Sequence, residues 1–436
     1  MVFSCGCAPS LSAADTLPID TVFPVVAEFP GGTIEGTEGD SLVIVTPAGW
    51  TAGVLYPHCR SWSEDGRWLF FSAIPGTLPG NEARGDIWIL AADLDTRKIH
   101  QIATIPNKAA FPNKQIFNQV DVTPEGGRLV YFQRNENTIH VVDLRTGDER
   151  CVFAEKNGSL GEPPSISPSG NRIAWFSRFM EPPGPRFGGY ASTVFYMDLD
   201  PDLGVPVGSP EAVYRFSTMH VSGQPGFRNH VSLSHVQLNP ADYDVIAYCR
   251  GSYAPADGSV ALSRMWTVDA SGAPQRLLAR TEAGRFHTHE LWSDDGEWMY
   301  FIDTGDLARI HRDGGEIETL ATGLKPAALH LSMSRDKTRI AYDARLPGRG
   351  PSSPADPADY PVEIWSFDTR KNAAHRVAIT HNNERFHSHA HPKISPDGSK
   401  IAFTAVEGSR SAVIVAELGP AEMQAAPSKA EATDLR

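Results

Sequence analysis

The chain has 436 residues, of which 41 % are hydrophobic and 21 % are charged, an ordinary composition for a globular protein with a substantial buried core. The formal net charge of −13 argues against a general surface for nucleic acids or anionic membranes. An anionic ligand would therefore need a local cluster of basic side chains or a metal. The five cysteines are scattered and odd in number, which argues against a disulfide framework.

The two ends of the chain differ in composition from the rest. The first residues, MVFSCGCAPSLSAAD, contain no positively charged segment, and no run approaches the length of a transmembrane helix. We expect a cytoplasmic protein, or a periplasmic one if SLSAAD is the end of a truncated leader. We also expect residues 1–20 to be a flexible segment and residues 420–436 to be a disordered tail. The oligomeric state has no signature in the sequence.

Seven copies of one pattern follow each other along the chain. In each copy a turn rich in Ser, Pro, Asp and Gly leads into a short apolar strand, and further strands follow. In chain order the copies are SWSEDGRWLFFSA, DVTPEGGRLVYFQR, SISPSGNRIAWFSR, QLNPADYDVIAYCR, LWSDDGEWMYFID, SMSRDKTRIAYDAR and KISPDGSKIAFTA. Short segments rich in β-branched and aromatic residues and bounded by turns are typical of antiparallel strands, and no stretch shows a helical period.

The repeats predict an all-β fold, a seven-bladed β-propeller of four-stranded antiparallel blades in one domain over residues 21–419. They resemble the repeats of TolB-type propellers. The last copy is one strand short, and we expect the N-terminal stretch GTIEGTEGDSLVIVT to supply that strand and close the ring. The Asp-Gly turns are interpreted as structural, because they supply positive φ. Four tryptophans are expected in the core between blades: Trp62, Trp175, Trp292 and Trp365.

One position of the repeat is unusually rich in histidine. We call it the register position, and it lies four residues before the Ser, Thr or Asn that opens each turn. In chain order it is occupied by Cys59, Gln119, Pro163, His235, His289, His330 and His391. The strand that enters the turn is the innermost strand of a propeller blade, so equivalent positions meet around the central channel. His287 and His389 lie two residues earlier, and strand alternation is expected to keep them on the same face.

Imidazoles gathered in this way suit a divalent transition metal. The sequence His389-x-His391 provides two donors from one strand, and a histidine from another blade provides a third. Such a face leaves open coordination positions, as catalysis requires. Each histidine taken alone would be an ordinary hydrogen-bonded channel residue. The shared register is what favours a site.

Several segments together resemble the oligogalacturonate lyases, polysaccharide lyase family 22. The matching segments are SHVQLNP, RMWTVDASG, HELWSDDG, ALHLSMSRD and HAHPKISPDG. The resemblance implies a seven-bladed propeller that cleaves uronic-acid oligosaccharides by β-elimination. It implies that His289, His389 and His391 bind a manganese-type cation, with Zn²⁺, Ni²⁺, Fe²⁺ or Ca²⁺ as alternatives, and that His235 is the Brønsted base.

The chain also departs from that family. Phe386 stands where the family has a glutamine ligand, and His387 or water can take over that role. The sequence CRGS stands where the family has Cys-His-Glu-Gly. An oligosaccharide containing a different uronate therefore remains an alternative substrate. We assign Arg60, Arg250 and His330 to holding the carboxylates or hydroxyls of an anionic oligosaccharide.

Two other classes of function compete with a lyase. A non-enzymatic TolB-type scaffold for protein interactions would share the repeats, but it gives no reason for histidines in register. A hydrolase is the other class. The chain has no G-x-S-x-G stretch and no α/β segment for a peptidase domain, and no paired carboxylates stand out at the register position as a glycosidase would need.

Overall fold

The computed structural model describes the greater part of the repeats. The described residues are 17–29, 33–35, 41–76, 85–106, 120–161, 163–180, 190–218, 233–250, 264–271, 276–278, 287–322, 324, 327–346, 359–383, 389–407, 410–418 and 424–425. Within them the only α-helix is α1 (Ile19–Val22), and no helix is long and apolar enough to cross a membrane. Most of the two predicted terminal segments, 1–20 and 420–436, lies outside the described residues, so the domain boundaries stay predictions.

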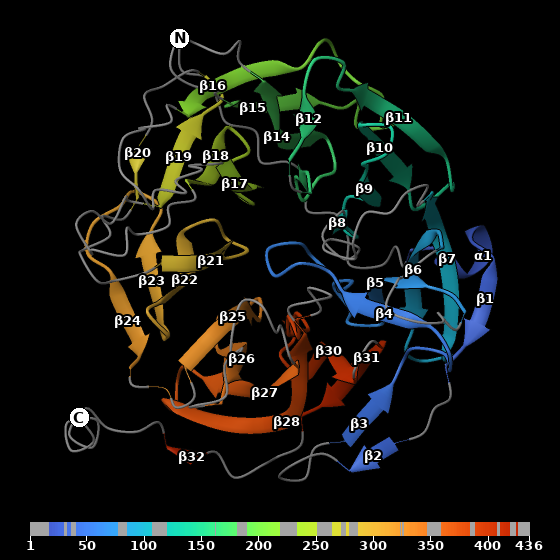
Figure 1. Ribbon diagram of the computed structural model, residues 1–436, viewed down its shortest axis with the longest axis vertical. Coiled ribbons are helices and arrows are strands. Elements are labelled where there is room, and N and C mark those ends of the chain that lie inside the picture. Colours follow the sequence, from blue (N-terminus) through green and yellow to red (C-terminus); the bar gives the residue numbers. More distant parts are fainter. Residues whose placement is uncertain are drawn as a thin grey trace, which may run out of the picture.

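Seven antiparallel sheets stand around a central axis, as the repeats predict (Figure 1). Three of them, here called blades 2, 4 and 5, have four strands that follow each other in chain order. The strands of blade 2 are β8 (Val120–Thr123), β9 (Arg128–Gln133), β10 (Thr138–Asp143) and β11 (Glu149–Ala154). Those of blade 4 are β17 (Leu233–Leu238), β18 (Val245–Arg250), β19 (Met265–Asp269) and β20 (Arg276–Leu277). Those of blade 5 are β21 (His287–Trp292), β22 (Trp298–Asp303), β23 (Asp306–His311) and β24 (Glu318–Ala321).

The other four blades carry a fifth short strand. Blade 1 has β4 (Thr51–Val54), β5 (Trp68–Ile74), β6 (Ile87–Asp93), β7 (Lys98–Ile105) and, outermost, β1 (Val25–Glu28). Blade 3 has β12 (Ser159–Leu160), β13 (Ser165–Ile166), β14 (Arg172–Met180), β15 (Tyr190–Asp198) and β16 (Glu211–Thr218). Blade 6 has β25 (Ala327–Met333), β26 (Arg339–Arg345), β27 (Asp359–Asp368), β28 (Ala373–Asn383) and β32 (Gln424–Ala425).

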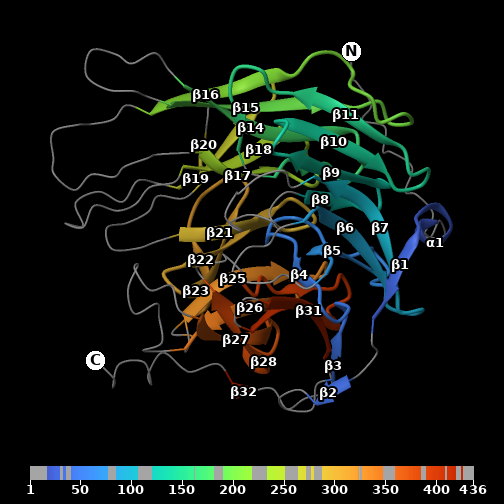
Figure 2. The ribbon, with the colours of Figure 1, turned by 45° about the vertical axis from the view of Figure 1, so that its right-hand side comes forward.

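Blade 7 joins the two ends of the repeat region. It contains β29 (Lys393–Ile394), β30 (Lys400–Glu407), β31 (Arg410–Glu417), β3 (Ser41–Ile44) and β2 (Thr33–Glu35). The N-terminal strand β3 pairs antiparallel with β31, with Ser41 opposite Glu417. The predicted closure of the ring by GTIEGTEGDSLVIVT is therefore confirmed. In Figure 2 the N-terminal β3 lies beside the C-terminal β31, while α1 and β1 lie on the outer edge of blade 1.

The hydrophobic core is divided into seven clusters, each between two neighbouring blades. Between blades 1 and 2, for example, Trp68 and Phe70 pack with Leu129 and Tyr131. The remaining clusters continue this arrangement around the ring and back to blade 1. The four tryptophans expected between blades, Trp62, Trp175, Trp292 and Trp365, all lie in or against these clusters. Apolar contact between blades thus holds the ring closed around its axis.

The repeated turn fixes the end of each inner strand. In the first copy the Ser63 hydroxyl donates to Asp65 and accepts from the N–H of Trp68. The same bonds recur in copies five, six and seven. The turn glycine has φ of 68° at Gly66 and 73° at Gly398, a backbone conformation that favours glycine. The predicted structural role of these turns is confirmed, and in copies one, five, six and seven the same bonds fix the end of the inner strand that carries the register position.

Candidate functional site

The histidines of the register position meet inside the ring. The ring centroids of His235 and His289 lie 6.4 Å apart, those of His289 and His330 4.1 Å, and those of His330 and His391 4.4 Å. His389 joins this group, 5.4 Å from His330 and 5.5 Å from His391. We call these five residues the histidine cluster. Blades 4, 5, 6 and 7 each contribute to it, so the predicted convergence of distant imidazoles is what the structure shows.

Three residues of the histidine cluster have an unusual backbone. The φ angles of His235, His289 and His391 are 51°, 56° and 43°, in the left-handed region that residues other than glycine rarely adopt. The pairing register also shifts next to His235 and His289, so each sits in an irregularity of its inner strand. A left-handed residue costs roughly 1–2 kcal/mol. Strain of this kind, repeated at equivalent positions, is typical of a site that the rest of the fold must hold in place.

The same irregularity corrects one expectation. Simple strand alternation would keep His287 on the face of His289. Instead the His287 ring packs 4.9 Å from that of Phe301, and its Nε2 lies 3.5 Å from an Asp303 oxygen. The left-handed turn at His289 breaks the alternation, so the two histidines have different neighbours. For His389 and His391, by contrast, the two rings do lie side by side.

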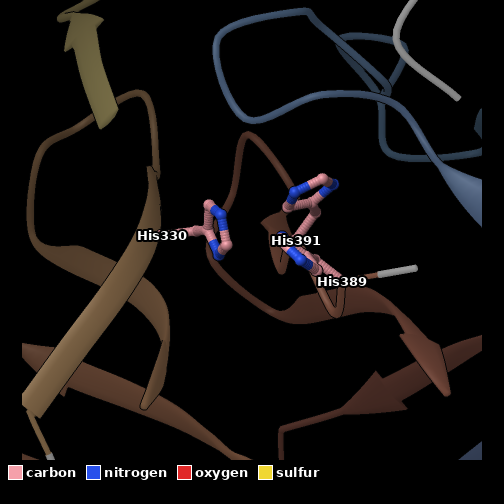
Figure 3. Close-up of side chains that lie close together, drawn as sticks. All are labelled: His330, His389 and His391. Atoms are coloured by element: carbon pink, nitrogen blue, oxygen red, sulfur yellow. The ribbon is translucent and has the colours of Figure 1, made fainter. Parts of the chain in front are cut away.

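Three ring nitrogens in the histidine cluster are close enough to share a cation. His330, His389 and His391 each offer a ligand atom, and these atoms lie within 4.8 Å of one another. Figure 3 shows the imidazole of His330 facing those of His389 and His391 across a small gap. The segment that carries His389 and His391 is anchored, because the N–H of Ala390 donates to Asn382 Oδ1 at 2.9 Å. His387 lies outside the described residues, so its predicted role as a ligand stays a prediction.

The electrostatic setting favours the neutral form of His289 and of His391. Burial, reinforced by the neighbouring His330 and His235, lowers the pKa of His289 well below its ordinary value. Burial together with His330 and His389 does the same for the pKa of His391. Within the described residues, His289 Nδ1 and His391 Nε2 are buried and have no hydrogen-bond partner. Neutral imidazoles with unsatisfied nitrogens are the donors that a transition metal prefers.

His235 belongs to a second group at the edge of the histidine cluster. Its Nδ1 lies 2.9 Å from Glu290 Oε2, and its Nε2 lies 2.9 Å from the Tyr56 hydroxyl. Arg264 Nε donates to the other oxygen of Glu290 at 2.5 Å. Burial alone would raise the pKa of Glu290, but Arg264 and the hydrogen bond to His235 outweigh it and hold this pKa well below its ordinary value. The carboxylate is therefore ionised and fixes the orientation of the His235 ring. Cys249 lies beside this pair as well.

Blade 1 contributes to the site through a loop. Tyr56 and His58 lie next to Cys59, the register position of the first copy, and their rings contact His235 at 5.3 Å each. The buried Lys393 holds this loop, since its ammonium donates to the carbonyl oxygens of Tyr56 and Pro57 at 2.6 Å and to that of Cys59. Burial lowers the pKa of Lys393 to about 8, although Cys59 and Asp121 act in the opposite direction. A lysine of blade 7 thus positions side chains of blade 1.

Several of these groups have no signature in the repeat pattern. Glu290 follows His289 directly, and only the left-handed backbone of His289 turns it toward His235. His58 stands one residue before a register position occupied by cysteine, so the register count passes over it. Both residues belong to segments already selected for their histidines or turns. The signal available in the sequence is that a charged or aromatic residue stands directly beside a register position.

The two predicted arginines are placed differently from the histidines. Arg60 donates from its backbone N–H to Asp121 Oδ1 at 3.0 Å and from Nη2 to the Ile166 carbonyl at 3.3 Å. It lines a pocket among the turns together with Trp62 and Arg335. The backbone of Arg250 ends strand β18 opposite Leu233, while its side chain lies outside the described residues. The assignment of both arginines to substrate binding stays a prediction.

Comparison with known proteins adds a family resemblance to this geometry. The chain is 26 % identical over 205 residues to the oligogalacturonide lyase of Pectobacterium atrosepticum, an alignment that covers 43 % of this chain and 50 % of that protein. It is 25 % identical over 205 residues to the oligogalacturonate lyase of Dickeya dadantii, with the same coverage. The chain thus matches about half the length of these curated relatives. No protein-family model matches it.

Solved structures show the same fold over nearly the whole chain. The structure of an oligogalacturonate lyase in complex with manganese has a TM-score of 0.68 and 18 % identity, and the match covers 92 % of this chain and 98 % of that one. The oligogalacturonate lyase of Vibrio parahaemolyticus also has a TM-score of 0.68, with 15 % identity and coverage of 92 % and 99 %. The resemblance read from the sequence motifs is therefore confirmed, and so is the seven-bladed propeller.

Proposed function

We propose that this protein is a metal-dependent lyase that cleaves oligosaccharides containing uronic acid by β-elimination. The observation that carries the proposal is the histidine cluster, in which imidazoles from four blades meet in one buried group beside the paired His235 and Glu290. The sequence similarity to two oligogalacturonate lyases supports the choice of a uronide as substrate. The manganese in the structure of a similar lyase supports the choice of a divalent cation, Mn²⁺ first.

The residues present fit such a cation. His289, His389 and His391 would hold it. Burial lowers the pKa of His289 and His391, and each of these two carries a buried ring nitrogen without a partner among the described residues. When bound, the cation supplies a Lewis acid that neutralises the carboxylate of the sugar. This neutralisation is needed because the proton on C5 is very weakly acidic while the adjacent carboxylate keeps its charge. The predicted roles of Arg60 and Arg250 in holding the carboxylates remain part of the proposal.

His235 is the base in this proposal. The ionised Glu290 accepts a hydrogen bond from Nδ1, so in the tautomer that acts as a base this nitrogen carries the proton and Nε2 carries the lone pair. In the free protein the Tyr56 hydroxyl donates to this lone pair. Nε2 is thus the atom that would take the C5 proton, and the resulting imidazolium would face the carboxylate of Glu290. The electrons of the C5–H bond form the C4–C5 double bond as the C4–O bond breaks, and the departing oxygen takes a proton from water to become a hydroxyl.

The test combines elemental analysis with an assay for unsaturated uronides. Purified protein is expected to retain one divalent cation per chain and to produce the ultraviolet absorbance of a conjugated uronide from at least one member of a panel of oligouronates. If product forms from a uronide other than galacturonate, the proposed reaction is supported and the substrate is that other uronide. Protein that retains no cation and yields no product from any uronide would contradict the proposal and favour a scaffold function.

A further inference from the structure

We propose that His330 is an additional protein ligand of the cation, supplying the donor that Phe386 lacks. This inference rests on the proposed function, because it concerns the same cation. The resemblance to the oligogalacturonate lyases points to a glutamine at the position of Phe386 and assigns no ligand to His330. The sequence predicts that His330 binds the substrate. The geometry around His330 points to the metal instead.

The first argument is distance. The ligand atoms of His330, His389 and His391 all lie within 4.8 Å of one another. Two nitrogens that bind one transition metal at about 2.1 Å each are separated by no more than about 4.2 Å. Only a small movement of the rings would therefore bring all three onto one cation. The centroid of the His289 ring also lies 4.1 Å from that of His330.

The second argument is the orientation of the His330 ring. Its Nδ1 lies 3.0 Å from each oxygen of Asp343, and its backbone N–H donates to Asp343 Oδ1 at 2.7 Å. Asp343 is completely buried. Carboxylate oxygens that accept from the backbone N–H and face Nδ1 place the ring proton on Nδ1 and the lone pair on Nε2. A carboxylate that fixes the tautomer of a histidine in this way is the usual outer partner of a metal-binding imidazole.

The third argument is the surroundings of Nε2. Among the described residues no group hydrogen-bonds this nitrogen. The backbone N–H and the Nδ1 atom of His330, by contrast, both have Asp343 on the paired strand as their partner. His330 is only 4 % exposed and is surrounded by the rings of His289, His389 and His391. A residue that holds a sugar must present surface to it. His330 presents its surface to other imidazoles, which suits a shared cation better than a substrate.

The experiment measures the affinity for Mn²⁺ alone, by electron paramagnetic resonance of the free ion, in metal-stripped protein and its variants. His330→Ala is expected to weaken binding by about a hundredfold or more, and Asp343→Asn by about tenfold. His330→Gln, which restores an oxygen or nitrogen donor, should recover part of the affinity. His100→Ala is the matched control, because His100 is fully buried in blade 1 and hydrogen-bonds the Phe23 carbonyl.

Binding of Co²⁺ gives a second readout that does not depend on activity. The visible spectrum of the Co²⁺ protein should change in intensity and position when His330 is replaced, and it should be unchanged in His100→Ala. Unchanged Mn²⁺ affinity and an unchanged Co²⁺ spectrum in a folded His330→Ala or His330→Gln variant would overturn the inference. Should the alanine variant not fold, the glutamine and Asp343→Asn variants decide.

The outcomes separate this inference from the proposed function. A wild-type protein that binds Mn²⁺ through His330 but yields no unsaturated product contradicts only the proposed function. An active lyase whose Mn²⁺ affinity is indifferent to His330 contradicts only the inference made here.

Discussion

Blades 4 to 7 and blades 1 to 3 share one architecture but differ at the register position. In blades 4 to 7 every register position is a histidine, and three of the four have a left-handed backbone. In blades 1 to 3 the position holds Cys59, Gln119 and Pro163. The turn that follows is built in the same way in both halves, as the hydrogen bonds of Ser63 and Ser293 show. The scaffold is therefore uniform, and the chemistry is concentrated in one half.

Blade 1 contributes side chains to the site through a loop instead of through its register position. Its register cysteine does not join the histidine cluster, but the preceding loop brings Tyr56 and His58 against His235. That loop depends on Lys393, which belongs to blade 7 and lies two residues after His391. The two halves are thus connected at the site by hydrogen bonds from a lysine side chain to backbone carbonyls. Activity should therefore depend on residues of blades 4 to 7, and the contact of blade 1 with the site should depend on Lys393.

The largest expected effect is on catalysis. Replacing His235 in blade 4 with alanine removes the proposed base and should lower the rate of elimination by about 10²–10⁴-fold while Mn²⁺ stays bound. His140→Ala in blade 2 is the control, since His140 stacks on Tyr131 and hydrogen-bonds Thr138 on its own blade. The rates are measured by the ultraviolet absorbance of the product. An active His235→Ala enzyme would remove His235 from the role of base.

A smaller loss is expected when Glu290 is replaced. Glu290→Gln keeps the shape of the side chain but removes the charge that faces His235 and Arg264. We expect a rate about tenfold lower, and the acidic limb of the pH–rate profile should move to lower pH because the imidazolium loses its counter-charge. Glu363→Gln is the matched control, since Glu363 is buried and paired with Arg376 in blade 6. A lower rate with an unmoved profile would mean that Glu290 is only structural.

The connection between the halves predicts an effect on stability. Lys393→Met leaves the buried carbonyl oxygens of Tyr56, Pro57 and Cys59 without their shared donor. The free energy of unfolding should fall by about 2 kcal/mol, as is typical for buried polar groups that lose a partner. Denaturant unfolding measures it, with Lys98→Met on the exposed side of blade 1 as a control that should change little. Equal stability of the two variants would show that Lys393 does not hold the loop.

The smallest effect concerns the pH dependence of metal-free protein. Burial, with help from His235 and Lys393, lowers the pKa of His58 well below the ordinary value of 6.5. The unfolded chain then binds more protons than the folded one between the two pKa values, so this contribution to stability is present above the ordinary pKa and is lost as the pH falls from there toward the lowered pKa. In His58→Asn the slope of unfolding free energy against pH should be shallower, by about 1 kcal/mol per pH unit. An unchanged slope would mean that His58 is protonated equally in both states.

The fold could be predicted from the sequence because the same turn and strand pattern recurs in every copy of the repeat. Each copy carries its own turn and strands, and the missing strand of the last copy pointed to Ser41–Ile44. The register count also brought His235, His289, His330 and His391 together correctly. These inferences needed only the spacing of the copies along the chain and the assumption that the copies are arranged around one axis.

The parts that the sequence could not provide depend on local backbone conformation. Nothing in the string HTHEL indicates a left-handed residue, yet that conformation at His289 interrupts the strand alternation and turns Glu290 toward His235. The pairing of His330 with Asp343 likewise joins two strands whose register shifts between Ala328 and His330. Strained positions and bulges are where pattern-based reasoning fails, and here they coincide with the site.

The central claim is that histidines from separate blades bind one divalent cation at the axis of the ring. The most direct measurement is anomalous X-ray diffraction from crystals grown with Mn²⁺, recorded on both sides of the manganese absorption edge. The account predicts a single strong anomalous peak among the imidazoles of His289, His330, His389 and His391. A peak at any other place, or no peak at this cluster while Mn²⁺ is in excess, would contradict it.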